Sequence, residues 1–210
     1  MSKKTNSPLG KPRRRRRKPE AAESEILNAA EQFLRESPLC DMTVDDIMSR
    51  TGLSRPSFYE YFRDRNQLVI KLAERVGAQN ATIVAKWLTS ANPVEDLRPV
   101  TNETVELAVS QGHLLRALAD AANSDHQVET TYRREMQAAI DKTAQRIRDD
   151  AVNGLVKLDG IDAQHLATAL ILMNSAYLIE AMGRRPQADP KTVAETLIAI
   201  WSRVLYGIPR

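Results

Sequence analysis

The sequence predicts an all-α fold, and three observations support this prediction. Apolar residues recur at steps of three and four along most of the chain, as Leu68, Leu72 and Val76 illustrate. Asp, Ser or Thr precedes these periodic segments as an N-cap, and Gly or Pro follows them. No segment alternates apolar and polar residues as a strand would, and no internal repeat is found. With 42% hydrophobic residues among 210, the chain can bury a core, and about nine helices are expected.

Residues 1–19 are predicted to form a disordered basic arm. Residues 1–18 hold nine Lys or Arg and no acid, and they have too few apolar side chains to fold alone. We expect the arm to follow the DNA backbone or to insert arginines into the minor groove. A passive solvated tail and, more weakly, attraction to anionic lipid are the alternatives. The arginines of this predicted contact are Arg13, Arg14, Arg15, Arg16 and Arg17.

Residues 20–66 are predicted to form a small helical headpiece. Its first helix spans 20–36 and ends before Pro38, because a residue that precedes proline avoids the helical region. Residues 19–75 carry seven bases against eleven acids, so this part of the chain is net negative. The arm must therefore supply much of the electrostatic attraction to phosphate.

Two short helices and a tight turn follow within residues 43–62. Thr43 and Asp46 have the spacing of a capping box at the start of the first of them. Gly52 is expected to turn the chain in a left-handed conformation, and Ser54 to cap the second helix, with Pro56 in its first turn. This pattern predicts a helix-turn-helix, the layout that places its second helix in the major groove of DNA.

The second of these helices is predicted to have an apolar and a polar face. Phe58 and Phe62, four residues apart, should point inward. Arginine can bind guanine in a bidentate fork, serine can bond any base, and tyrosine hydroxyls commonly reach phosphates. The outward residues that supply these groups are Arg55, Ser57, Tyr59 and Tyr61.

Residues 67–210 are predicted to form a larger helical domain for ligand binding and dimerisation. The expected helices, the first of which starts in the headpiece, cover residues 64–90, 97–111, 113–122, 125–153, 162–182 and 189–206. The last two are apolar over more than a narrow stripe, which favours burial on two sides and therefore a homodimer. A deeply buried monomer core is the alternative. A two-fold symmetric dimer is expected to bind a palindromic DNA site, because each half-site would contact one subunit.

Enzyme, metal and membrane functions find little support. His113, His126 and His165 lie far apart, and no phosphate loop or nucleophile elbow is present, so no cofactor is expected. No uninterrupted apolar run reaches the length of a bilayer span. A single cysteine, Cys40, cannot form an internal disulfide, which fits a reducing cytoplasm, and we expect it to be buried or half-buried.

The stretch TVDDIMSRTGLSRPSFYEYF, residues 43–62, resembles the headpiece of TetR-family transcriptional regulators. The resemblance implies an all-helical homodimer in which Arg55, Pro56 and Ser57 read bases. It also implies that Tyr59 and Tyr61 touch phosphates or thymine methyls, although many members carry His at the latter position. The complete set of predicted contacts in the headpiece is Thr43, Ser54, Arg55, Pro56, Ser57, Tyr59, Tyr61 and Arg65, the last a basic phosphate-contacting position.

The C-terminal half is similar to one branch of this family through HLATALILMN, residues 165–174, and the ending Ile200-Trp201 with Tyr206-Gly207. In that branch an asparagine at the position of Asn174 binds ligands in a long apolar tunnel. Ile171 replaces a second asparagine, which implies a different or more apolar ligand. The predicted ligand residues are Asn174, Trp87, Met136, Ile171, Met173 and Tyr177, and ordinary core packing is the alternative for each.

The leading hypothesis is a ligand-responsive transcriptional repressor. It would bind a palindromic operator in double-stranded DNA as a homodimer and release it when a small apolar effector fills the C-terminal domain. A nonspecific architectural DNA-binding protein dominated by the basic arm is the second hypothesis. A ligand-binding protein with a vestigial headpiece is the third.

Overall fold

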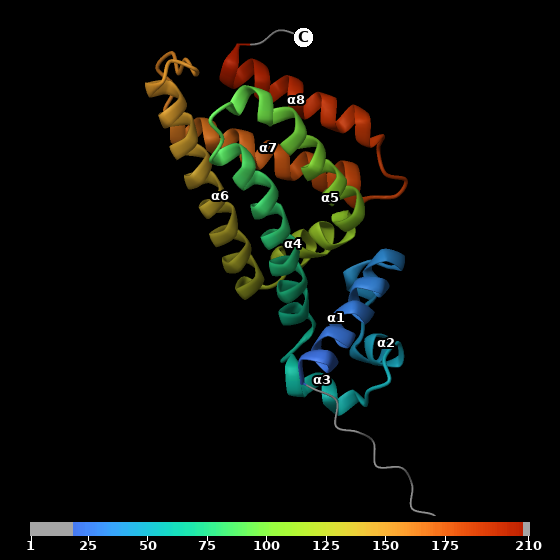
Figure 1. Ribbon diagram of the computed structural model, residues 1–210. Coiled ribbons are helices and arrows are strands. Elements are labelled where there is room, and N and C mark those ends of the chain that lie inside the picture. Colours follow the sequence, from blue (N-terminus) through green and yellow to red (C-terminus); the bar gives the residue numbers. More distant parts are fainter. Residues whose placement is uncertain (1–18, 208–210) are drawn as a thin grey trace, which may run out of the picture.

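The computed structural model describes residues 19–207, and every regular element in that range is a helix (Figure 1). The basic arm, with Arg13 to Arg17, lies outside the described residues. The all-α prediction is confirmed. The elements are α1 (Pro19–Glu36), the 3-10 turn η1 (Leu39–Asp41), α2 (Val44–Ser49), α3 (Arg55–Tyr61), α4 (Arg65–Leu88), α5 (Pro93–Ala122), α6 (His126–Val152), α7 (Ala163–Gly183) and α8 (Pro190–Tyr206).

The predicted N-caps explain where most of these helices begin. Thr43 accepts from the backbone of Asp46, whose carboxylate accepts from the backbone of Thr43, and this is the expected capping box. Aspartates cap four longer helices by accepting from free N–H groups of the first turn. They are Asp64 before α4, Asp125 before α6, Asp162 before α7 and Asp189 before α8.

The long helix α5 differs from the sequence prediction. Residues 97–111 and 113–122 do not form two helices, because Gly112 lies inside one continuous helix. The described residues therefore hold eight α-helices rather than about nine. A Cβ on Gly112 would lie 2.3 Å from the carbonyl oxygen of Met182, so the missing side chain lets α5 and α7 approach closely. The glycine marks a helix crossing and not a helix end.

The helix α5 is the centre of the C-terminal domain, since it packs against α4, α6, α7 and α8. Figure 1 shows the headpiece helices α1, α2 and α3 gathered at one end of the molecule, with α4 running from them into the larger domain. The headpiece core is shared with that domain. Phe58 and Phe62 belong to the same buried cluster as Leu114, Ala117 and Ala121 of α5.

Two local expectations are wrong. Cys40 is exposed, because it lies in the short η1 turn, where its thiol contacts the carboxylate of Asp41. Gly52 does not adopt the expected left-handed conformation. Instead, its N–H donates to the Glu25 carboxylate, which holds the turn. Among the described residues, α7 is long and apolar enough, by length and composition alone, to cross a membrane. Its sequence is nevertheless interrupted by polar residues such as His165, Asn174 and Glu180, so it holds no uninterrupted apolar run of that length.

The Gly112→Ala variant tests the close crossing of α5 and α7. We expect it to lower the free energy of unfolding by about 1–3 kcal/mol, because the methyl group would overlap backbone atoms of Met182. Urea unfolding followed by circular dichroism measures the change.

The matched control is Gly77→Ala in α4, where no atom lies within 4 Å of the added Cβ. Alanine should there stabilise the protein by about 0.5–1 kcal/mol through helix propensity. Equal effects of the two substitutions would show that the crossing at Gly112 is not tight.

Candidate nucleic-acid interface and ligand region

The helix α3 presents a polar surface because its apolar residues are buried beneath it. Phe58 is fully buried and contacts the rings of Phe62 and Tyr59, with centroids 5.5 and 5.3 Å away. Tyr59 itself is 55% exposed. Arg55 and Pro56, in the first turn, are exposed as the sequence predicted. The outward face can therefore enter a groove without disturbing the core.

The guanidinium of Arg55 has a partner on the neighbouring helix. Its Nε lies 3.2 Å from a carboxylate oxygen of Asp45, and the two side chains are 60% and 68% exposed. An exposed pair of this kind contributes about 0–1 kcal/mol, so a base can displace it at low cost. Ser54 does not cap α3 through its side chain, because its hydroxyl lies 3.0 Å from that of Ser57.

Three other predicted contact residues have structural partners. Thr43 uses its hydroxyl in the capping box. Tyr61 is half-buried, whereas we expected it to face outward, because it packs against the buried cluster that contains Phe58 and Phe62. Arg65 donates a hydrogen bond to the carbonyl oxygen of Met42 while remaining exposed. Their roles in DNA contact remain predictions.

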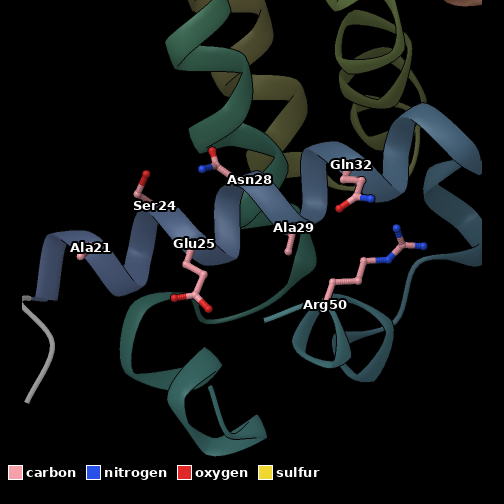
Figure 2. Close-up of a pocket in the computed structure, with 7 residues that line it drawn as sticks. All are labelled: Ala21, Ser24, Glu25, Asn28, Ala29, Gln32 and Arg50. Atoms are coloured by element: carbon pink, nitrogen blue, oxygen red, sulfur yellow. The ribbon is translucent and has the colours of Figure 1, made fainter. Parts of the chain in front are cut away.

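Sequence reasoning missed the side chains that hold the turn between α2 and α3. The Glu25 carboxylate of α1 accepts from the N–H of Gly52 at 2.7 Å. Arg50 at the end of α2 donates to Glu36 at 2.7 Å, and this bond lowers the pKa of that carboxyl. Figure 2 shows Glu25 and Arg50 beside a hollow of about 460 Å³ that runs along α1. No local pattern reveals pairs so far apart in the chain.

Two further contacts join the headpiece to the first turn of α6. Arg63, just after α3, donates to the side-chain oxygen of Gln127 at 2.7 Å. Asn66 in α4 donates to Asp125 at 3.0 Å. Hydrogen bonds from the backbone N–H of Val128 and then from the side chain of Asn66 lower the pKa of the Asp125 carboxyl. The charged carboxylate therefore accepts these hydrogen bonds. The position of α3 is thereby tied to that of α6.

The predicted ligand residues are only partly brought together. Ile171 and Met173 pack against the buried cluster that contains Trp87, and Met173 and Tyr177 border the cluster between α5, α7 and α8. Asn174 is half-buried on α7, beside Ser175, whose hydroxyl lies 3.3 Å from that of Tyr132. Met136 is half-buried on α6 and belongs to neither cluster. None of the six lines the hollow along α1.

Trp87 is more constrained than the prediction assumed. It is 3% exposed and meets Trp201 edge to face, with ring centroids 5.8 Å apart. Its indole Nε1 donates to the hydroxyl of Tyr206 at 3.1 Å, and that hydroxyl donates to Asp150 at 3.2 Å. Burial raises the pKa of the Tyr206 hydroxyl, which therefore stays protonated and able to donate.

A buried ion pair anchors this network at the far end of α4. Arg146 and Asp150 lie one turn from each other on α6. A guanidinium nitrogen of Arg146 is 2.9 Å from a carboxylate oxygen of Asp150, and the two side chains are 11% and 2% exposed. Arg146 also donates to the carbonyl oxygen of Ser90 at 2.7 Å and to that of Leu88 at 3.3 Å. These bonds satisfy free carbonyl groups at the end of α4 and just after it. The pair thus joins α4, α6 and α8.

Comparisons with known proteins agree with both halves of this architecture. Residues 26–72 match the model of the bacterial regulatory proteins of the tetR family. Residues 98–207 match the model of the C-terminal domain of the transcriptional regulator EthR.

Relatives extend this similarity along the chain. The HTH-type transcriptional regulator EthR of Mycobacterium tuberculosis is 32% identical over 188 residues, which cover 87% of this chain and 86% of that protein. EthR of Mycolicibacterium smegmatis is 29% identical over 206 residues, covering 97% and 94%. The structure of SmeT, the repressor of the Stenotrophomonas maltophilia multidrug efflux pump SmeDEF, shares the fold with a TM-score of 0.69 at 20% identity, over 87% of this chain and 89% of that one.

The Asp150→Ala variant tests the buried ion pair. We expect it to lower the free energy of unfolding by about 3–5 kcal/mol, because Arg146 would be left buried without its counter-charge. Thermal and urea unfolding measure the change.

The control is Asp149→Ala, which removes the neighbouring exposed carboxylate that accepts from Gln145. Its effect should stay within about 0.5 kcal/mol. A loss at Asp150 no larger than that at Asp149 would show that the pair does not hold the domain together.

Proposed function

Because the chain belongs to the TetR family of transcriptional regulators and is EthR-like, we propose that it is a repressor that binds a palindromic operator as a homodimer. A small apolar molecule that enters the C-terminal domain releases the operator. The observation that carries the proposal is the surface of α3, where Arg55, Pro56 and Tyr59 are exposed above a buried Phe58.

The apolar surface of the last two helices supports the homodimer. On α7, Leu172 is 50% exposed, and Ala169 and Ala176, one turn to either side of it, are also exposed. On α8, Val204 is 43% exposed. Apolar side chains at these spacings along an outer helix face are stabilised by burial against a second copy of the chain. The dimer would then present two α3 helices to successive major grooves.

The effector mechanism follows from the position of α4. This helix carries Trp87 at its end in the C-terminal domain and Arg65 at its start in the headpiece, about 35 Å away at 1.5 Å per residue. A ligand that separates α7 from the cluster around Trp87 would shift this helix. The ligand can lower the affinity for DNA only to the extent that it binds the shifted state more tightly than the DNA-binding state. Asn174 would hydrogen-bond the ligand while Met136, Ile171, Met173 and Tyr177 enclose it.

The basic arm and the cellular location complete the proposal. Arg13 to Arg17 would follow the phosphate backbone beside the site read by α3, and Thr43, Ser54, Ser57, Tyr61 and Arg65 would fix the register on the operator. The single cysteine and the similarity to EthR support a cytoplasmic location. The relatives are regulators and not enzymes, and no catalytic role is proposed.

The Arg55→Ala variant tests base reading by α3. We expect it to reduce the preference for the operator over random duplex by about 1–3 kcal/mol, because one bidentate contact to a base is lost. Fluorescence anisotropy with operator and random duplex, at matched salt, measures both affinities.

Two other variants serve as controls for this measurement. Lys71→Ala removes an exposed charge of α4 that is paired with Glu74, and it should leave the preference unchanged. Deletion of residues 1–18 should weaken binding to both duplexes and flatten the salt dependence. A wild-type preference below about tenfold would favour the architectural alternative instead, since specific readers usually exceed about 10³.

The Leu172→Glu variant tests the dimer surface. A charge in the centre of an apolar interface is left without a partner, so we expect monomers in sedimentation equilibrium and weakened operator binding. Val152→Glu is the control, because Val152 is an apolar residue that is 87% exposed and lies on another helix, at the end of α6. Dimers that persist in the Leu172 variant would place the interface elsewhere.

A further inference from the structure

A second cleft lies between the headpiece and the C-terminal domain. Its volume is about 260 Å³, near the lower end of the roughly 300–1,000 Å³ typical of ligand pockets. One wall is the end of α1 with η1, from Leu34 to Leu39, and the other is α5 from His113 to Asp120. Gly183, the last residue of α7, and Arg185, just after it, close one side. The cleft therefore bridges the two parts of the molecule whose relative position controls DNA reading.

His113 contributes a polar atom that lacks a partner. Its Nε2 is buried and forms no hydrogen bond within the described part of the chain. Burial first, and then the positive charges of Arg35 and Arg185, lower the pKa of His113 to about 4, although Glu31 acts in the opposite direction. The imidazole is therefore neutral at pH 7. A buried polar atom without a partner is costly. Because Nε2 is closed to solvent in this structure, a ligand in the cleft would satisfy it once the imidazole ring turns toward the cleft that His113 lines.

Arginines outnumber acids around the cleft. Three arginines and two acids line it. Arg116 is bonded to Asp120 at 3.0 Å, and Arg35 to Glu31. Arg185 is exposed and has no ion-pair partner between residues 19 and 207. The remaining lining includes the apolar side chains of Leu34, Pro38, Leu39 and Ala117.

We propose that this cleft binds a small carboxylic acid, whose carboxylate contacts Arg185 and His113 and whose apolar part packs against Leu34 and Leu39. Guanidinium groups form strong charge-assisted hydrogen bonds with carboxylates. Nε2 of a neutral imidazole donates to a carboxylate when it carries the ring proton. The site is distinct from the region around Trp87 and Asn174, because none of those residues lines it.

A bound acid would act on DNA binding through the position of the headpiece. It would add contacts between the end of α1 and α5, where the shared core already joins the two parts through Leu114 and Ala117. The headpiece would adopt one position when the protein binds the operator and another when it does not. The acid would change operator affinity to the extent that it binds one of these positions more tightly than the other. This regulatory role rests on the proposed repressor function, whereas the binding site itself does not.

Calorimetric titration of the full-length protein without DNA tests the site. Benzoate and hexanoate are the probes, and benzamide is the uncharged counterpart of benzoate. We expect saturable binding of one acid per chain, with benzamide weaker by about tenfold or more because the charge-assisted bond is lost. No saturable binding by either acid at millimolar concentrations would overturn the proposal.

Two arginine variants locate the bound acid. Arg185→Ala should lower the affinity for benzoate by about tenfold or more. Arg184→Ala is the matched control, because that neighbouring side chain is bonded to Glu180 at 2.7 Å and does not line the cleft. Unchanged affinity in the Arg185 variant would place the acid elsewhere, such as in the C-terminal core, and would overturn the proposal.

Operator titration of the same samples separates the two proposals. Benzoate that binds through Arg185 but leaves operator affinity unchanged would establish the site and overturn its regulatory role. A protein that binds benzoate but shows no operator preference would contradict the proposed repressor function and leave the site standing.

Discussion

The packing of the headpiece against the last turns of α5 is the constraint on which the rest of the structure depends. The small α1, α2 and α3 helices do not close a core alone, because Leu114, Ala117 and Ala121 of α5 complete it. The exposed surface of α3, which we propose reads DNA, therefore takes its orientation from the larger domain. The polar contacts of Arg63 and Asn66 with the start of α6 add a second connection to the same domain. Both connections fix the position of the headpiece relative to α5 and α6.

The opposite end of α4 is held just as firmly. Arg146 bonds the carbonyl groups that follow its last turn, and Trp87 is joined to α8 through Tyr206. A helix fixed at both ends transmits displacement along its length instead of absorbing it in a loop. A ligand that changes the populations of two such states from 1:99 to 99:1 must prefer one of them by about 5.5 kcal/mol. Because the described core is closely packed and resists gradual deformation, it favours two discrete arrangements.

Much of the fold could be predicted because the signals are local. The capping box at Thr43 and the N-cap at Asp125 act within one turn of their own helices, and spacings of three and four residues define an apolar face. The predictions failed where a distant partner decides the outcome. Gly112 remains inside a helix because Met182 lies against it, and Glu25 rather than a left-handed residue holds the turn at Gly52. Neither partner is visible in a short window of sequence.

The sequence by itself determined the helical class, the short helix α3 with Arg55 and Tyr59 outward, and the resemblance to the TetR family. These follow from hydrogen bonds and side-chain spacings within one or two turns of a helix. Only the tertiary structure decided that Arg55 is paired with Asp45, that Trp87 is bonded to Tyr206, and that a cleft separates α1 from α5 beside His113. The reason is geometric. Periodicity shows which face of a helix is buried, whereas crossing angles and close approaches select the residue that each side chain meets.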